Sequence, residues 1–500
     1  MHFSTLTAAL ASAAAFTLTE AASKKSSRTF ATVQFGGGKE LTRCRLDPIV
    51  NPGGVSNHQH SVFGGNAFSA DMPGDAATKA TCTTANVKND HSNYWVPSLY
   101  FKSPDDGTLY PVELFYPKVY YFFEPTNDEI KAFPKGFRML AGDTSLRAPP
   151  SPAKDNLDPS KGPITPVQWT CPRSDSNSKS PLYPANSDGK HGVGIQDPSN
   201  GGQGWGFPDQ ECDGYASPLR ADIHFPSCVN PNVDPANYKE NSCYPSDNGQ
   251  GGQDCPKGWI HVPHVFMEVY WNTLVFQDKW EKGKGNTPWV LSNGDTTGYS
   301  LHADFLNGWD TETLQYAIDN CDPGNDGLLK CPGLPGGATS EDEMKACKVT
   351  CPLGESDAIG TPMPGNKLLG NNPFSGYQAA PYAAPGGSDS DSSVAPQPVA
   401  PVKAAEADRP STTMYALPAS SKPEAQGANP QANPGGHTAY TSVYNIHTVI
   451  KTITVPAGGV TPAPVPAPPV AKGKKKEDCT TTTRRRHHRG RRHSHRALDY

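Results

Sequence analysis

Several common functional signatures are missing from this sequence of 500 residues. It has no G-x-S-x-G elbow, no H-E-x-x-H pair and no G-x-x-x-x-G-K-[ST] loop, so the usual marks of serine hydrolases, zinc proteases and phosphate-loop enzymes are absent. After the N-terminus no stretch approaches the roughly 18 apolar residues of a membrane-spanning helix. No Asn-x-Ser/Thr acceptor occurs, so ordinary N-glycosylation is not expected.

The N-terminus and the cysteines both point to secretion. The chain starts uncharged, continues as L-T-A-A-L-A-S-A-A-A-F-T-L and then reaches small residues, which predicts a signal peptide over residues 1–22. We therefore expect an extracellular or cell-wall-associated protein. Eleven of the twelve cysteines lie between Cys44 and Cys351 and should form disulfides in an oxidising compartment. Eleven is odd, so one is left over unless Cys479 pairs with it.

The composition divides the chain into a folded domain and two tails. Residues 28–355 contain nearly all the Trp, Phe and Cys and are predicted to form the domain. Residues 356–471, rich in Pro, Ala, Gly, Ser and Thr, predict a flexible linker. In residues 472–500, four lysines and seven arginines oppose three acidic residues, which suggests binding to anionic polymers. With a signal peptide, wall polymers fit better than nucleic acid, and a solvated tail without a partner is the alternative.

Strand signals dominate the predicted domain. Residues 112–123 and 259–273 are rich in aromatic and β-branched side chains, and Pro117 suggests an edge or a bulge. Short helices are expected after two capping boxes, at Thr126 with Glu129 and at Ser340 with Glu343, and after a cap at Asp310 or Thr311. The fold class predicted is mainly β: an antiparallel β-sandwich or jelly-roll-like core with long loops, a few short helices and disulfides, and a disordered C-terminal third.

The strand predicted near residue 264 has two chemically different faces. One face is apolar and the other is mixed, because alternate residues point to opposite sides: Val265, Met267, Val269 and Trp271 against His264, Phe266, Glu268 and Tyr270. The mixed face resembles the floor of a binding cleft. Ordinary packing of polar side chains on the second face of a sheet is the alternative.

Histidines and carboxylates recur at a spacing of two residues. His58 and His60 follow Asp47, Asp222 precedes His224, and His302 precedes Asp304. On a strand each such pair shares a face, and a carboxylate beside an imidazole suits a metal ligand or a general base. The catalytic hypothesis comprises His58, His60, His264, Glu268, His302 and Asp304. The hypothetical ligands of a divalent metal are His58, His60 and His224; without a metal, His and Glu or Asp would act as base and acid.

A cluster of aromatic residues suggests a carbohydrate substrate. The segment D-H-S-N-Y-W-V-P-S-L-Y spans residues 90–100, and sugars stack on such rings while carboxylates and amides bind their hydroxyls. The substrate-binding hypothesis comprises Asp47, His91, Tyr94, Trp95, Tyr270 and Trp309. Aromatic side chains buried in the core beside disulfides are the alternative for each ring.

Several long motifs resemble the fungal secreted family called domain of unknown function 1996. They lie at residues 45–60, 90–100, 133–142, 213–228, 255–273 and 301–310. The resemblance covers roughly residues 30–325 and implies an extracellular protein, often with a variable C-terminal extension, but no established activity. The family commonly has C-T-T-C where this chain reads Cys82-Thr83-Thr84-Ala85, which accounts for the odd cysteine count and leaves the partner of Cys82 open.

Two functional hypotheses follow from the sequence. In the first, a secreted enzyme, a hydrolase or a lyase, acts on extracellular polysaccharide through a cleft of histidines and carboxylates, with or without a metal. In the second, a non-catalytic lectin or scaffold protein binds cell-wall glycan. The first depends on whether His58 and His60 face His224, His264 and His302 across one cleft, whereas the second is based on the aromatic residues and the basic tail.

Overall fold

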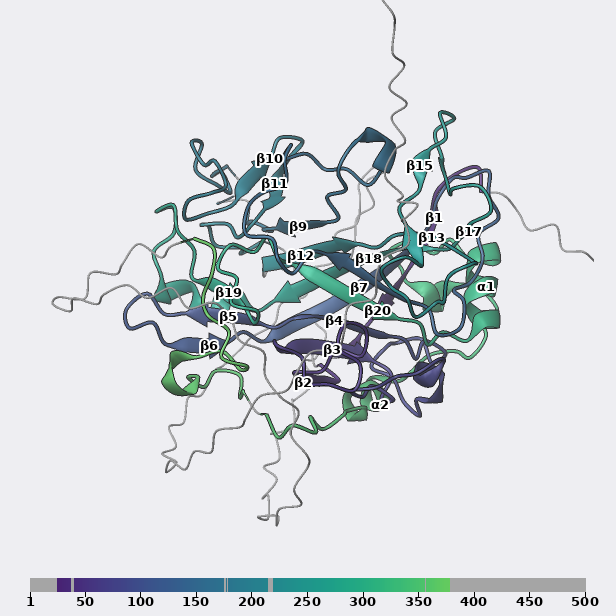
Figure 1. Ribbon diagram of the computed structural model, residues 1–500, viewed down its shortest axis with the longest axis horizontal. Coiled ribbons are helices and arrows are strands. Elements are labelled where there is room, and N and C mark those ends of the chain that lie inside the picture. The colour runs from purple at the N-terminus through teal and green to yellow at the C-terminus, as the bar shows by residue number, and fades with distance from the viewer. Residues whose placement is uncertain are drawn as a thin grey trace, which may run out of the picture. The chain divides into compact units, whose positions relative to one another are not determined.

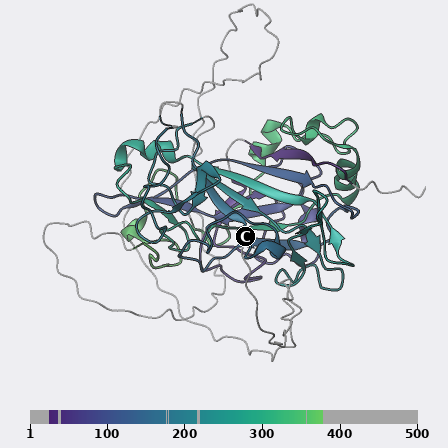
Figure 2. The ribbon, with the colours of Figure 1, turned by 90° about the horizontal axis from the view of Figure 1, so that it is seen from above.

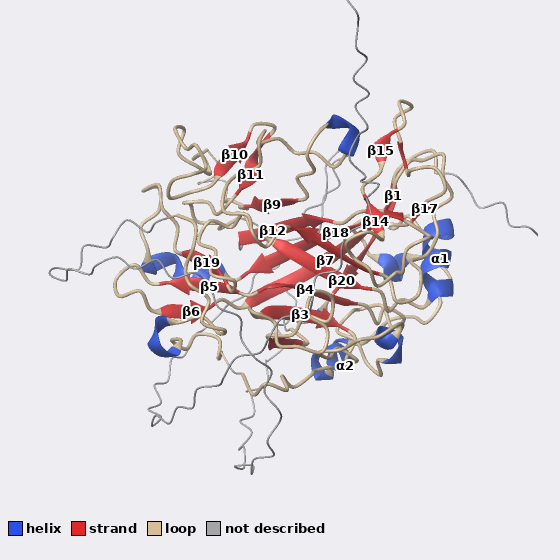
Figure 3. Cartoon of the chain, viewed as in Figure 1, coloured by secondary structure: helices blue, strands red, loops and turns tan. Residues whose placement is uncertain are grey.

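A computed structural model describes residues 25–36, 40–174, 177, 179–214, 219–355 and 357–377. All of them belong to one compact unit, in which strands predominate (Figure 3). The predicted signal peptide, residues 378–471 of the predicted linker and the predicted basic tail lie outside these residues. Among the described residues, no helix is long and apolar enough to cross a membrane. The prediction of a mainly β fold with antiparallel sheets is confirmed.

Two antiparallel sheets supply the main layers (Figure 1). In spatial order, the seven-stranded sheet consists of β1 (Thr29–Gln34), β7 (Leu114–Phe123), β18 (His264–Trp271), β12 (Leu219–His224), β9 (Val167–Thr170), β11 (Asn200–Trp205) and β10 (Ile195–Asp197). The five-stranded sheet consists of β2 (Thr42–Cys44), β3 (His60–Gly64), β4 (Asn93–Pro97), β20 (His302–Leu306) and β8 (Arg138–Gly142). Smaller sheets contain β5 (Leu99–Lys102), β6 (Leu109–Pro111) and β19 (Trp289–Leu291); β13 (Cys228–Val229), β14 (Ser242–Cys243) and β17 (Ile260–His261); and β15 (Ser246–Asp247) with β16 (Gln253–Asp254).

The helices are short and lie around the strands (Figures 1 and 2). Helix α1 (Thr311–Asn320) begins after Asp310, whose carboxylate accepts a hydrogen bond from the Thr313 backbone. Helix α2 (Glu341–Ala346) begins with the predicted capping box, in which Ser340 and Glu343 satisfy each other's backbone N–H groups. Short 3-10 helices occur at Ala76–Lys79, Pro159–Lys161, Thr273–Lys279, Leu328–Lys330 and Pro364–Asn366.

The helix expected after Thr126 is wrong, because that segment forms turns. The Thr126 hydroxyl donates a hydrogen bond of 2.9 Å to Asp254, which is 128 residues away in sequence, and the same carboxylate accepts one from the backbone of Asn127. The same hydroxyl accepts one from the backbone of Asp128 at 3.0 Å. A Thr side chain that bonds the backbone two residues ahead favours a turn over a helix.

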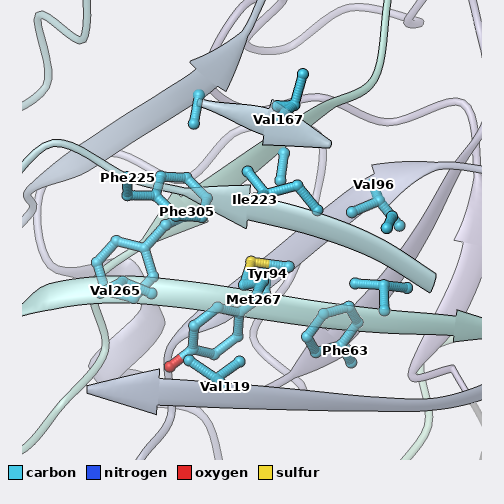
Figure 4. Packing of buried hydrophobic residues seen from close by; sticks show 14 of the residues in the cluster. Phe63, Tyr94, Val96, Val119, Val167, Ile223, Phe225, Val265, Met267 and Phe305 are labelled. Carbon is cyan, nitrogen blue, oxygen red and sulfur yellow. The ribbon is translucent and has the colours of Figure 1, made fainter. Parts of the chain in front are cut away.

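The main core lies between the two sheets. Val119, Ile223 and Met267 of the seven-stranded sheet meet Phe63 and Phe305 of the five-stranded sheet (Figure 4). All five side chains are fully buried, and burial of each contributes about 1.5–3 kcal/mol relative to exposure. The apolar face predicted for β18 therefore points into this core.

Pro117 lies within β7 at a local edge. β1 pairs with β7 only as far as Lys118, so at Pro117 the strand has β18 as its neighbour on one side. A proline has no N–H to donate. At Pro117 none is needed, because β1 ends before it reaches this position.

Five disulfides connect the described residues. They join Cys44–Cys351, Cys82–Cys347, Cys171–Cys212, Cys228–Cys255 and Cys321–Cys331. Cys82, whose partner the sequence left open, thus pairs with Cys347 at the end of α2. Cys243 is the one core cysteine outside these five disulfides, and it is buried beside Cys228 in the paired strands β13 and β14.

The packed chain continues past the domain boundary predicted at residue 355. Met363 and Leu368 are buried against Tyr100, in a small cluster of their own. Further along, the Tyr377 hydroxyl lies 3.1 Å from that of Tyr299. The Pro- and Gly-rich composition that predicted a linker here includes enough apolar side chains to hold this segment on the domain.

Candidate functional site

The histidines predicted to converge form two separate groups. His58, His60 and His302 meet on the five-stranded sheet, whereas His224 and His264 meet on the seven-stranded sheet. Alternate residues of a strand point to opposite faces, and the intervening residues of both sheets fill the core between them. The two groups therefore lie on opposite outer faces of the sandwich, and His224 does not join His58 and His60.

The histidine trio consists of His58, His60 and His302, whose three rings meet near the starts of two strands. His60 starts β3 opposite Pro97 of β4, and His302 starts β20, the strand on the other side of β4. Nε2 of His58 lies 3.1 Å from Nε2 of His302, and one ring nitrogen from each histidine falls within 4.8 Å of the others. Their exposed fractions are 5%, 0% and 1%, so the trio is closed to a polymer.

Each ring of the trio has its other nitrogen engaged. Nδ1 of His60 lies 2.9 Å from the carbonyl oxygen of Leu46, and Nδ1 of His302 lies 2.7 Å from that of Ser300. Nδ1 of His58 lies 2.6 Å from the side-chain oxygen of Asn57. Burial lowers the pKa of His60 and of His302 to about 4 and that of His58 well below its usual value, so all three rings are neutral at neutral pH.

Two carboxylates accompany the trio. Asp304 shares the outer face of β20 with His302 and lies opposite Trp95 of β4. Both of its carboxylate oxygens are buried without a hydrogen-bond partner among the described residues, and burial, with the nearby charge of Asp47, raises its pKa well above the usual range. Asp47 accepts hydrogen bonds from the backbones of Ile49 and Val50, and burial raises its pKa as well.

The second group belongs to a larger polar and aromatic surface on the seven-stranded sheet. We call it the outer β7–β18–β12 face. Its side chains come from alternate positions of three neighbouring strands: Tyr116, Lys118, Tyr120 and Phe122; His264, Phe266, Glu268 and Tyr270; Arg220, Asp222 and His224. Most of the rings on this face are half-buried, so part of each remains open to a ligand.

An ion cluster occupies one end of this face. Asp222 and Glu268 lie opposite each other, and Arg220 approaches them at 2.6 Å and 2.9 Å, respectively. Burial alone would lower the pKa of Arg220, but the two carboxylates raise it. Burial raises the pKa of Asp222 in spite of that guanidinium. The hydroxyls of Tyr120 and Tyr270 both donate to Glu268, at 2.9 Å and 3.3 Å.

A chain of hydrogen bonds crosses the other end. Nδ1 of His264 lies 3.3 Å from Glu124, and Nε2 of His264 lies 3.1 Å from Nδ1 of His224. The carboxylate fixes the proton of His264 on Nδ1, so its Nε2 accepts the N–H of His224. Burial alone would raise the pKa of Glu124, but His264 and Arg28 lower it overall. Nε2 of the half-buried His224 is then left with its lone pair.

Aromatic rings cover the same end in contact with one another. The ring centroid of Phe266 in β18 lies 5.4 Å from that of Tyr120 and 4.3 Å from that of His224. The rings of Phe266 and His224 are stacked nearly parallel. Phe122 lies 5.6 Å from the ring of His264. Such rings bury area against each other and still present faces or edges to a ligand.

Most of the aromatic residues predicted to bind substrate lie in the interior. Tyr94 stacks on Phe63 in the main core, and Trp309 is buried with its ring N–H 2.8 Å from the Tyr121 hydroxyl. Trp95 is buried under the loops that cover the five-stranded sheet. His91 is half-buried and stands apart from both histidine groups. Among this predicted set, Tyr270 is the residue found on the outer β7–β18–β12 face.

Some residues of this face were missed by reasoning from the sequence. Tyr120, Phe122 and Glu124 come from β7 and its end, and Arg220 comes from β12. The alternation within residues 114–123 does contain the signal, because the buried and half-buried residues of β7 alternate. The alternation does not reveal which strand lies next to β7. The pairing with β18 is what places the β7 residues beside His264 and Glu268.

Comparison with known proteins identifies a family. The model of the family described as Domain of unknown function (DUF1996) matches residues 47–309. This match covers more than half of the chain, so the chain belongs to that family. No curated protein and no solved structure matches this chain significantly.

Proposed function

We propose that this protein is secreted and binds extracellular polysaccharide, such as a cell-wall glycan, along the outer β7–β18–β12 face. One observation carries the proposal: half-buried rings such as Tyr120 and Phe266 lie in register with hydrogen-bonding groups such as Glu268. A sugar ring has apolar C–H faces and a polar rim, and this combination complements both. The buried histidine trio offers a polymer no such access.

The charge of the face favours a neutral glycan. On this face and at its edge, three cationic residues, Arg28, Lys118 and Arg220, are matched by three acidic ones, Glu124, Asp222 and Glu268. A balanced set of charges gives no net attraction for a polyanion. Binding of nucleic acid or of a strongly anionic polymer to this face is therefore not expected.

Secretion is supported by the disulfides. Five disulfides in the described residues are typical of proteins that fold in an oxidising compartment and are rare in the cytosol. The signal peptide predicted at residues 1–22 would provide the route.

Retention of the purified full-length chain on insoluble glycans tests the proposal. The probes are particles of β-glucan, chitin and mannan. We expect the chain to be retained by at least one of them, and Tyr120→Ala with Phe266→Ala to weaken that retention roughly tenfold, since tenfold corresponds to about 1.4 kcal/mol. Val275→Ala, at an apolar side chain exposed by 47% elsewhere on the surface, is the matched control. Failure of all three glycans to retain the chain, or equal retention of the double variant, would overturn the proposal.

A second candidate function is catalysis on the same face. The Glu124–His264–His224 chain favours it, because it resembles the arrangements that orient a general base. New reducing ends without unsaturated sugars would indicate a hydrolase, and new reducing ends accompanied by unsaturated sugars would indicate a lyase. His224→Gln should then abolish product formation and leave glycan retention in place. Retention without products from the unchanged chain would identify a non-catalytic lectin or scaffold protein.

The predicted basic tail would contribute separately to retention on wall polymers. Residues 472–500 carry the cationic excess that the outer β7–β18–β12 face lacks. Deletion of these residues should reduce retention on anionic wall polymers, and the effect should weaken with added salt. Retention on neutral glycan should be unchanged.

A further inference from the structure

We propose that the histidine trio binds one divalent transition-metal ion of the kind that prefers imidazole nitrogen, such as Zn²⁺, through the three Nε2 atoms of His58, His60 and His302. Histidines of this trio come from the end of one loop and the first residues of two strands that flank β4. Imidazole suits zinc, copper, nickel and iron, whereas magnesium and calcium prefer oxygen.

The hydrogen bonds of the trio fix its tautomers. The partners of the three Nδ1 atoms are two backbone carbonyl oxygens and the side-chain oxygen of Asn57. An oxygen of this kind can only accept, so each Nδ1 carries the proton. Each Nε2 is then left with a lone pair, and metal-bound histidines in proteins characteristically have their second nitrogen engaged in this way.

The spacing of the lone pairs matches a shared ion. Two nitrogens each about 2.0–2.1 Å from a tetrahedral zinc ion lie about 3.3 Å apart. Nε2 of His58 and Nε2 of His302 are separated by 3.1 Å, and the ligand atoms of all three rings lie within 4.8 Å of one another. A small adjustment of the His60 ring would bring all three Nε2 atoms within bonding distance of one ion.

Without an ion this arrangement is unfavourable. Nε2 of His60 is buried and has no hydrogen-bond partner among the described residues, and the Nε2 atoms of His58 and His302 would direct lone pairs at each other. A doubly protonated ring would relieve the contact, but a buried cation without a partner is costly. The pair His224 and His264 differs, since the carboxylate of Glu124 permits an ordinary N–H···N bond there.

A nearby carboxylate supplies the compensating charge. Three neutral imidazoles leave a divalent ion with its full charge, and Asp304 is buried on the same face of β20 with both oxygens unpartnered among the described residues. Its oxygens are not within the 4.8 Å group, so Asp304 would act as a counter-charge on the same face of β20 and not as a ligand. The otherwise costly burial of this carboxylate is thereby explained.

The other groups with suitable ligand atoms are poorer candidates. One contains Cys44 and Cys351 with Glu355, and another contains Cys255 with Asp128 and His261. The sulfurs of these three cysteines form disulfides, whereas a metal requires a thiolate. Because the trio is buried, its ion would have a structural role, joining the loop at Asn57 to the ends of β3 and β20.

Metal analysis of the full-length chain tests this proposal. The chain is stripped with a chelator, reloaded with Zn²⁺, freed of excess ion and measured by elemental mass spectrometry. We expect one equivalent of zinc in the unchanged chain, a visible absorption band typical of tetrahedral Co²⁺ on loading with cobalt, and a rise in melting temperature with metal. His302→Asn should remove the equivalent. His264→Asn, in the other histidine group, is the matched control and should retain it.

Asp304→Asn keeps the experiment decisive if His302→Asn fails to fold. It preserves all three ligands and the shape of the side chain, and it should bind zinc more weakly by about tenfold or more, because the cation loses its counter-charge in a buried environment. Absence of a stoichiometric metal in the reloaded unchanged chain would overturn the proposal. The same holds if folded His302→Asn retains a full equivalent, or if Asp304→Asn binds zinc as tightly as the unchanged chain.

Discussion

Asp222 and Glu268 lie directly opposite each other on neighbouring strands, and the guanidinium of Arg220 contacts both carboxylates. Two largely buried carboxylates on directly paired residues would repel each other strongly. Arg220 offsets that repulsion, and its Nη1 also lies 3.3 Å from the Tyr270 hydroxyl. The Asp222–Glu268 pair thus depends on Arg220 for its charge balance.

Arg220→Gln should destabilise the fold by about 3–5 kcal/mol, because it leaves buried carboxylates without their cation. The free energy of unfolding in urea at pH 7 measures this loss. Arg28→Gln is the control: Arg28 also pairs with a buried carboxylate but is 56% exposed, so its loss should cost about 1 kcal/mol or less. Equal effects of the two substitutions would contradict the role given to Arg220.

The stability of the domain should depend on the protonation of Asp90. Burial raises the pKa of Asp90 to about 7, although its carboxylate accepts hydrogen bonds from the Ser92 backbone and the Tyr94 hydroxyl. In the unfolded chain an aspartate has a pKa of about 3.9. The folded state therefore binds the proton more tightly, which adds stability that is complete below pH 4 and is lost as pH rises to 7.

Asp90→Asn should remove this dependence. Relative to the variant, the unchanged chain should lose about 1.4 kcal/mol of unfolding free energy for each pH unit between pH 4 and 7, and no more above pH 7. Urea titrations of both proteins at intervals of half a pH unit provide the measurement. Parallel pH profiles for the two would show that Asp90 ionises normally in the fold.

Gly64 should not tolerate a side chain. It ends β3 with φ of +110°, and a Cβ there would lie 1.8 Å from the carbonyl oxygen of Ser92 on the neighbouring segment. Gly64→Ala should therefore destabilise the domain by several kcal/mol, about 3 or more. Gly53→Ala, at another positive φ of +72° with nothing within 4 Å of the Cβ, should cost only about 1 kcal/mol. Thermal unfolding of the pair separates steric overlap from backbone strain.

The disulfide map can be checked by mass spectrometry of a non-reduced digest. The expected linkage is Cys82 with Cys347, not with another cysteine of the domain. Cys82→Ser should cost about 2–5 kcal/mol of stability, as for other native disulfides of secreted domains. A peptide that joins Cys82 to Cys243 would show a different pairing from the one described.

The sequence contains much of the local structure of this protein. The alternation along 264–271 predicts which side chains of β18 point into the main core, and Asp310 and Ser340 mark the starts of α1 and α2. These features depend on neighbours in sequence. The helix expected at Thr126 failed because Asp254, a carboxylate from a distant segment, accepts hydrogen bonds from both the Thr126 hydroxyl and the Asn127 backbone and holds this segment in a bend.

The grouping of the histidines could not be read from the sequence. A spacing of two residues places His302 and Asp304 on one face, but it does not say which sheet holds them or which face is outward. His58 and His302 meet across 244 residues because β3 and β20 pair with opposite sides of β4. His224 has the same spacing to a carboxylate, Asp222, and lies with His264 on the other layer.

Two of the disulfides span most of the domain. Cys44 pairs with Cys351 and Cys82 with Cys347, at sequence separations of 307 and 265 residues. A single break in the backbone anywhere between Cys82 and Cys347 would therefore produce two fragments that remain covalently joined. Outside a cell, where proteases cut exposed loops, this connectivity lets the sandwich survive a nick as one molecule whose two parts separate only when a reductant is present.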